Sequence, residues 1–244
     1  MENTNSNSSP EAPASILVLG IDQSLTNTGV CEMLYRPGMS IDAPEVKTYT
    51  LSPKLTGAER LNWFYDWASS AMARASLIVM EGYSFGSQNN REVMGELGGV
   101  LKIAAYQQGK QLIISPPWCI KNFALPSSRQ KMQGKEQMMQ AARDTFGIAL
   151  PLKKHEHEAD AAHLAHLGLY YATGQDSPYP RRQASLQQVR DSELSKAGQG
   201  NSGGGCHVDM TSAAAPISET VSVNAVAKPV AKEVRPVVKR GVRG

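Results

Sequence analysis

Cysteine is scarce in this chain of 244 residues, and this scarcity excludes a fold held together by disulfide bonds. The three cysteines, Cys31, Cys119 and Cys206, lie far apart and form no Cys-x-x-Cys pair. Disulfide frameworks and zinc ribbons both need closely spaced cysteines. We therefore expect reduced, structural thiols in a reducing compartment.

Long apolar runs are also missing. No run approaches the roughly 20 residues that an α-helix needs to span a bilayer. The first fifteen residues contain no lysine or arginine, and the apolar stretch after them is too short for the core of a secretory signal. We therefore expect a cytoplasmic protein that has no contact with a membrane.

A strong net charge is absent as well, since the formal charge is only +3. The charge is unevenly distributed, however, because residues 102–154 contain nine lysines and arginines against only Glu136 and Asp144. Such a cluster attracts polyanions and releases counterions when nucleic acid binds. The alternative interpretation is an ordinary solvated basic surface.

The composition changes near both ends of the chain. Residues 1–14 are polar and rich in proline, serine and asparagine, which predicts a disordered N-terminal tail. Residues 175–244 include the linker "GQGNSGGG" and a basic segment rich in alanine, valine and proline. We predict a low-complexity, disordered C-terminal tail there. The folded domain is expected to span residues 15–174.

Within this domain, hydrophobic periodicity predicts alternating strands and helices. The first three strands follow one another directly, whereas later strands alternate with helices, which is typical of an α/β domain with a mixed central sheet flanked by helices. The predicted strands are 16–22, 28–35, 46–51, 77–81 and 111–115. The predicted helices are 55–75, 90–108, 117–125, 134–146 and 155–173.

Two of these strands end on a carboxylate. The apolar run in "LVLGIDQSLTNTGV" stops at Asp22, and the buried-strand pattern "LIVME" stops at Glu81. In α/β sheets, ligand sites form at the ends of central strands. A carboxylate buried there is costly unless it is paired or bound to a cation. Each residue alone also fits an exposed strand end, but two acids at one edge favour a divalent metal site.

The last predicted helix begins with "HEHEADAAHLAHLGL" and supplies further ligand candidates. His157 and Asp160 are three residues apart, so both can project from one helix face. Glu156 and Glu158 have a simpler explanation, because acids stabilise the first turn of a helix. A zinc site built from the histidines of this segment is an alternative, although their spacing matches no common zinc pattern.

Three segments, "GIDQSLTNTGV", "LIVMEGYSFGSQNN" and "HEHEADAAHLAHLGL", occur in this order at separations that resemble the RuvC family of Holliday-junction resolvases, over residues 16–172. The resemblance implies an RNase H-like fold and a homodimer that nicks four-way or other branched DNA during recombination, repair or phage genome processing. The first segment departs from the family's usual Gly-Ile-Asp-Pro at Gln23, and little chemical consequence is expected from this change.

The resemblance also implies a metal site. Hard oxygen ligands suit Mg²⁺, with Mn²⁺ able to substitute. Two ions bridged by Asp22 would hold the scissile phosphate, one activating water and the other stabilising the leaving oxygen. The third ligand position is aspartate in some family members and histidine in others, and His157 fits this position. Glu156 is an alternative to His157. The implied ligands are Asp22, Glu81, His157 and Asp160.

The resemblance further implies residues that contact DNA. Lys121 and Lys135 match two basic positions of the family near the active site, where they would neutralise phosphate charge. An aromatic residue of the second segment, Tyr83 or Phe85, would stack on a base at the junction core. Two more basic residues are expected to contact the DNA backbone. These are Arg129 and Lys131.

Three other functions remain open at this stage. A kinase-like or actin-like ATPase would use the turn after Asp22 to bind phosphate, but such proteins need two domains of this size. An exonuclease with an Asp-x-Glu motif is disfavoured, because Gln23 and Ser24 follow Asp22. A non-catalytic module that binds branched DNA is opposed by the intact set of carboxylates.

Overall fold

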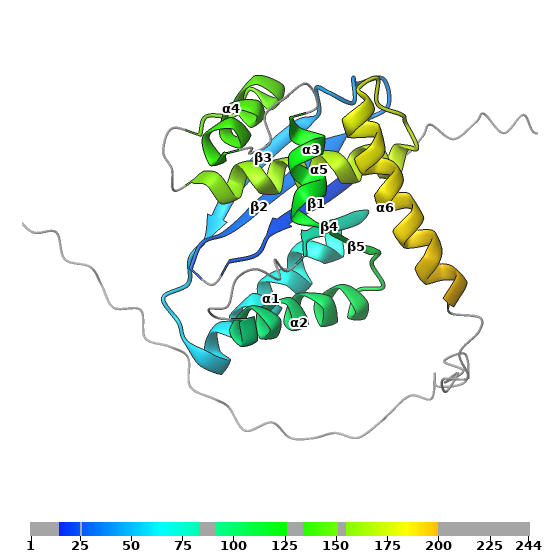
Figure 1. Cartoon of the computed structure of the whole chain (residues 1–244). Coiled ribbons are helices and arrows are strands. Elements are labelled where there is room, and N and C mark those ends of the chain that lie inside the picture. The colour runs from blue at the N-terminus through cyan, green and yellow to red at the C-terminus, as the bar shows by residue number, and fades with distance from the viewer. Residues whose placement is uncertain (1–14, 25, 83–90, 126–133, 151–154, 200–244) are drawn as a thin grey trace, which may run out of the picture. The chain divides into compact units, whose positions relative to one another are not determined.

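A computed structural model describes residues 15–24, 26–82, 91–125, 134–150 and 155–199. In this part of the chain, one central sheet lies between two layers of helices (Figure 1). The strands are β1 (Ile16–Asp22), β2 (Thr28–Tyr35), β3 (Glu45–Leu51), β4 (Leu77–Glu81) and β5 (Leu112–Ser115). The helices are α1 (Gly57–Arg74), α2 (Arg91–Gln107), α3 (Pro117–Ala124), α4 (Lys135–Phe146), α5 (Glu156–Thr173) and α6 (Pro180–Gln199).

The sheet is mixed, as the sequence predicts. Its strand order is β3-β2-β1-β4-β5, in which β1, β2 and β3 are antiparallel neighbours and β4 and β5 run parallel to β1. Parallel neighbours need a crossover connection, and helices α1 and α2 provide it. The three parallel strands therefore end at one edge of the sheet, where Asp22, Glu81 and Ser115 are the last residues of β1, β4 and β5.

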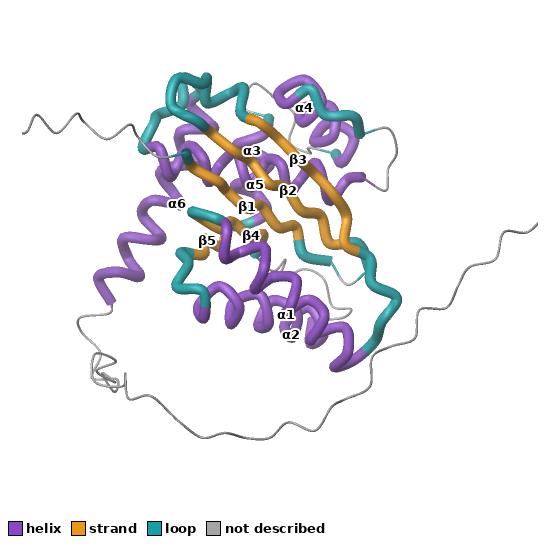
Figure 2. The backbone as a smooth tube through the Cα atoms, turned by 180° about the vertical axis from the view of Figure 1, so that it is seen from behind, coloured by secondary structure: helices purple, strands orange, loops and turns teal. Residues whose placement is uncertain are grey.

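The two faces of the sheet have separate hydrophobic cores, because side chains alternate along each strand. Leu19 and Ile21 of β1 pack with α1 and α2, whereas Val18 packs with helices of the opposite face. Figure 2 shows α1 and α2 together on their face of the sheet. By the same alternation, Asp22 points to the side of Val18, which is the face that α5 covers.

Helix α5 is buried on nearly all sides, between the sheet and helices α3, α4 and α6. Two strand glycines let it approach the sheet closely. A Cβ atom added to Gly20 would lie 2.1 Å from the carbonyl oxygen of Ala161, and one added to Gly29 would lie 2.0 Å from that of His157. The start of α5 is thus held directly against the end of the β1–β2 hairpin.

Helix α6 corrects the predicted domain boundary. The sequence predicts a low-complexity tail from residue 175, but residues 180–199 are helical and their first half packs against the domain. The buried Arg182 donates its Nε–H to the carbonyl oxygen of Phe123 at 3.1 Å, and Leu186 and Val189 fill the core beside it. The remaining parts of the predicted tails, residues 1–14 and 200–244, lie outside the described residues.

The other predicted strands and helices are all present, with ends that differ from the prediction by no more than two residues. Their boundaries were readable because each is marked by a change of periodicity or by a glycine or proline. Across the described ranges, no helix combines the length and the apolar character that crossing a membrane requires.

Candidate active site

A buried and a half-buried carboxylate meet where β1 and β4 end. The ladder pairs Ile21 with Met80, so the next residues, Asp22 and Glu81, follow side by side on neighbouring parallel strands. Asp22 is only 4% exposed. Burial and the adjacent charge of Asp22 raise the pKa of Glu81 from its ordinary 4.5 to about 9. Two ionised carboxylates at this depth therefore repel each other strongly unless a cation lies close by.

The first turns of α5 bring two more groups to the same edge. The Nδ1 atom of His157 lies 2.5 Å from Oδ2 of Asp22, and this hydrogen bond raises the pKa of His157. One turn later, burial and the charge of Asp22 raise the pKa of Asp160 to about 7. Asp22 is thus the common neighbour of Glu81, His157 and Asp160, which were predicted to form one site.

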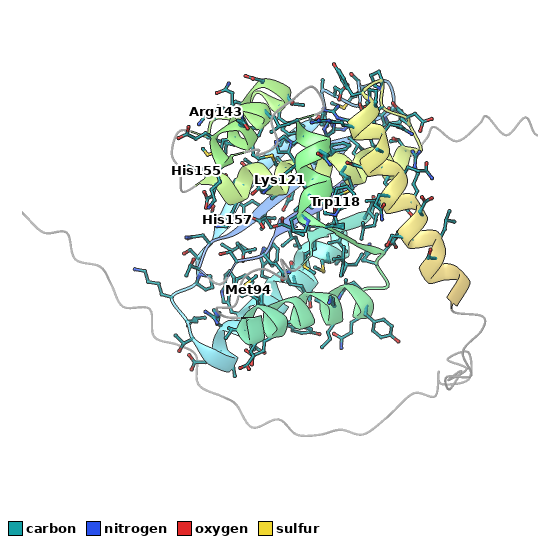
Figure 3. All side chains as sticks on the ribbon, viewed as in Figure 1. Met94, Trp118, Lys121, Arg143, His155 and His157 are labelled. Carbon is teal, nitrogen blue, oxygen red and sulfur yellow. The ribbon has the colours of Figure 1, made fainter. Side chains whose placement is uncertain are left out.

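Helix α3 adds a positive charge. It begins two residues after Ser115, which pairs with Glu81 in the sheet, so it starts at the edge where the carboxylates lie. The ammonium group of Lys121 acts on both Glu81 and Asp160 and partly offsets the rise in their pKa values. Figure 3 labels Lys121 on α3 and His157 near the start of α5.

Lys135 reaches this site through Glu156. Its Nζ atom lies 2.6 Å from Oε1 of Glu156, and the same oxygen is 3.8 Å from Nε2 of His157. Glu156 is therefore engaged by a lysine, whereas His157 is the residue turned to Asp22. The geometry favours His157 over Glu156 as the third ligand.

The two histidines further along α5 belong to the core. The Nε2 atoms of His163 and His166 each lie 3.1 Å from a backbone carbonyl oxygen, that of Met138 and that of Ile41 respectively. Both rings are buried, and burial lowers the pKa of each. These contacts leave no support for the zinc alternative.

The candidate ligands suit a hard divalent cation in their chemistry, because three carboxylates and one imidazole form an oxygen-rich set. In the conformation described here, no three acidic, histidine or cysteine side chains in the described ranges converge on a single ligating point. His157 is instead bonded to Asp22. Burial and the neighbouring charge of Asp22 raise the pKa values of Glu81 and Asp160, and a divalent cation beside them would favour their ionised forms.

Four predicted DNA contacts cannot be placed. The aromatic pair predicted to enter the junction and the basic pair predicted to bind the backbone all lie outside the described residues. Their roles therefore stay predictions. These residues are Tyr83, Phe85, Arg129 and Lys131.

Sequence reasoning missed two residues that position the site. Gln23, for which no structural role was predicted, is 7% exposed and donates its Nε2–H to the backbone oxygen of Glu81 at 3.1 Å, which ties the ends of β1 and β4 together. Gly29 stands opposite Asp22 in the β1–β2 ladder and admits the backbone of His157. The signal for Gln23 was its departure from the proline usual in the RuvC family.

Comparison with known proteins identifies the fold. No protein-family model matches the chain, and no curated protein sequence does. RuvC from Thermus thermophilus in complex with a Holliday junction substrate superposes with a TM-score of 0.53 at 20% identity, over 65% of this chain and 96% of RuvC. A second structure of Thermus thermophilus RuvC gives a TM-score of 0.51 at 20% identity, over 65% and 97% of the two chains.

The chain has a RuvC-type fold. This is an RNase H-like arrangement, in which a mixed five-stranded sheet is flanked by helices. At 20% identity the match establishes this fold alone, so the chemistry of the site must be argued from its own side chains.

Proposed function

We propose that this protein is a metal-dependent endonuclease that nicks four-way or other branched DNA. The observation that carries the proposal is that Asp22, Glu81, His157 and Asp160 all lie at one sheet edge, where the pKa values of Glu81 and Asp160 are both raised. Buried acids held this close are costly to the fold, and a cation-dependent reaction explains their presence. The Holliday junction bound by the RuvC structure supports branched DNA as the substrate.

Each group has a role in this reaction. These four residues would hold Mg²⁺ or Mn²⁺, with two ions expected per site. When bound, such ions neutralise phosphate charge and lower the pKa of coordinated water. Loss of its hydrogen bond to Asp22 would free the imidazole nitrogen of His157 to hold a metal ion or to accept a proton. Lys121 would place its ammonium group against the phosphate oxygens, where charge develops during hydrolysis.

Lys135 fits a role in binding the phosphate backbone. Its side chain is largely exposed and is held close to the site by Glu156. An approaching phosphate would compete with the Glu156 carboxylate for the same ammonium group. Because the exchange replaces one anion with another, it costs little and brings DNA beside His157.

We further propose a homodimer with two-fold symmetry, because a four-way junction has two equivalent strands to cut. Helix α2 exposes two large apolar side chains, Ile103 at 53% and Tyr106 at 80%. One turn earlier, a Cβ atom added to Gly99 would meet nothing within 4 Å, so another helix has room to approach. Sedimentation analysis of the purified protein tests this, and a monomer at all concentrations would contradict it.

The decisive experiment is cleavage of a synthetic four-way junction with the nick positions mapped. We expect symmetric nicks that require Mg²⁺ or Mn²⁺, no cleavage of a linear duplex, and no turnover of ATP. Asp22→Asn should abolish cleavage but retain junction binding. Asp66→Asn, which changes an exposed acid on α1, is the matched control and should cleave normally. Retained cleavage by Asp22→Asn would refute the metal-site assignment, and ATP turnover would favour the kinase-like alternative.

A further inference from the structure

Helix α3 carries an exposed tryptophan that the hydrophobic core does not use. Trp118 is 52% exposed, whereas the other side of the same short helix is buried. An indole contributes a large apolar area, and its exposure at the edge of a site is typical of a surface that binds a partner. The buried residues of α3 are Cys119, Ile120, Phe123 and Ala124.

The position of Trp118 connects it with the proposed active site. Trp118 and Lys121 are three residues apart, so they are neighbours on the exposed side of α3 (Figure 3). Their separation along the helix axis is about 4.5 Å, at 1.5 Å per residue. This is comparable with the rise of about 3.4 Å between successive nucleotides of one strand. Trp118 and Lys121 are therefore close enough to contact neighbouring nucleotides of one strand.

The charges of helix α3 itself favour nucleic acid as the partner of Trp118. The sequence of α3, PWCIKNFA, contains no acidic residue, and its one charged side chain is Lys121. An aromatic face beside a cation matches the way in which proteins bind single-stranded nucleic acid, with a base on the ring and a phosphate on the ammonium group. A purely apolar protein partner would have to desolvate Lys121, which is costly.

We propose that Trp118 is a base-stacking residue, whose indole stacks on an unpaired nucleotide adjacent to the phosphate that Lys121 contacts. This deepens the proposed function and rests on it. Bases in an intact duplex are already stacked on one another, whereas bases at a branch point or in a single strand present a free face. Trp118 therefore contributes to the selection of branched DNA over linear duplex.

The test measures DNA binding without cleavage, in the Asp22→Asn background at one fixed salt concentration. Adding Trp118→Ala should weaken binding to a four-way junction by about 5- to 150-fold, the range found for the loss of one base–aromatic stack. Binding to a linear duplex should change less than about twofold. Trp118→Phe should retain most of the junction affinity. Leu194→Ala, which removes another exposed apolar side chain, is the control and should change neither affinity.

Tryptophan fluorescence gives a second readout. The other tryptophans, Trp63 and Trp67, are partly buried on α1, on the opposite face of the sheet. Stacking should quench the emission of Trp118 when junction DNA or single-stranded oligothymidine is added, and this quenching should be absent from Trp118→Phe. Circular dichroism of each variant verifies that it is folded.

Three results would overturn the proposal. Trp118→Ala could bind the junction within twofold of its parent, or it could lose junction and duplex binding equally. It could also change the oligomeric state, which would place Trp118 in a protein interface. Failure of the proposed function is a separate result. If the protein does not cleave junctions, but oligothymidine quenches the emission of Trp118, the stacking role is supported and the nuclease function is refuted.

Discussion

Replacement of Gly29 by alanine tests whether the β1–β2 hairpin positions the start of α5. Gly29 pairs with Asp22 in the sheet, and α5 crosses directly above it. An added Cβ atom would lie 2.0 Å from the carbonyl oxygen of His157 and 2.8 Å from the backbone nitrogen of Glu158. Both neighbours are backbone atoms, so no side-chain rotation can relieve the contact. The first turn of α5 must move away as a unit.

The size of this movement follows from the contact distances. Ordinary van der Waals contact begins at 3.4 Å, so the carbonyl oxygen of His157 must retreat by about 1.4 Å. Overpacking of this kind typically costs about 1–3 kcal/mol of stability. Displacement of a catalytic group by 1 Å costs about 100-fold in rate. We therefore expect Gly29→Ala to cleave junctions about 100-fold more slowly, with junction affinity changed by only a few-fold.

Gly168→Ala provides the matched control on the same helix. Its Cβ atom would lie 2.5 Å from Cγ2 of Val79 and 2.8 Å from Cγ1 of Val18, so it also overpacks the contact between α5 and the sheet. It lies eleven residues beyond His157, which is about 16 Å along the helix. Single-turnover cleavage should be measured under conditions in which urea titration shows that both variants are folded. It should be impaired only in Gly29→Ala. Equal cleavage rates in the two variants would refute the reasoning.

Two further predictions concern stability. Because the pKa of Glu81 is raised, its ionisation lowers the free energy of unfolding of the wild type as pH rises from about 4.5 to about 9. Without divalent ions, the stability of Glu81→Gln relative to the wild type should therefore increase by at least about 1 kcal/mol between pH 6 and 8.5. Urea titration in EDTA measures this gain, and a difference that does not vary with pH would contradict it. Truncation after Gly174 removes Leu186 and Val189 from the core, at about 1.5–3 kcal/mol for each side chain, and should lower the melting temperature strongly. Truncation after Gln199 should not, and equal melting temperatures for the two proteins would show that α6 is dispensable.

The elements that were predicted correctly are those whose signals are local. The strand patterns that end at Asp22 and Glu81 are short apolar runs bounded by turn residues, and such runs can be read without knowledge of the fold. The pairing of His157 with Asp160 follows from helical spacing alone. Helix α6 was missed because its composition is polar and its buried side holds few apolar residues. Its anchor, Arg182, resembles an exposed residue in the sequence, although it is buried in the structure.

By itself, the sequence determined the order of strands and helices from β1 to α5, the mixed sheet and the candidate ligands for a hard metal ion, because these depend on periodicity and on the chemistry of single side chains. Only the tertiary structure decided which of these residues meet. The contact of His157 with Asp22, the Gln23 hydrogen bond to β4 and the space that Gly29 leaves for α5 join segments far apart in the chain. Such contacts depend on how closely a helix can approach a sheet, and this closeness depends on the packing of the whole domain.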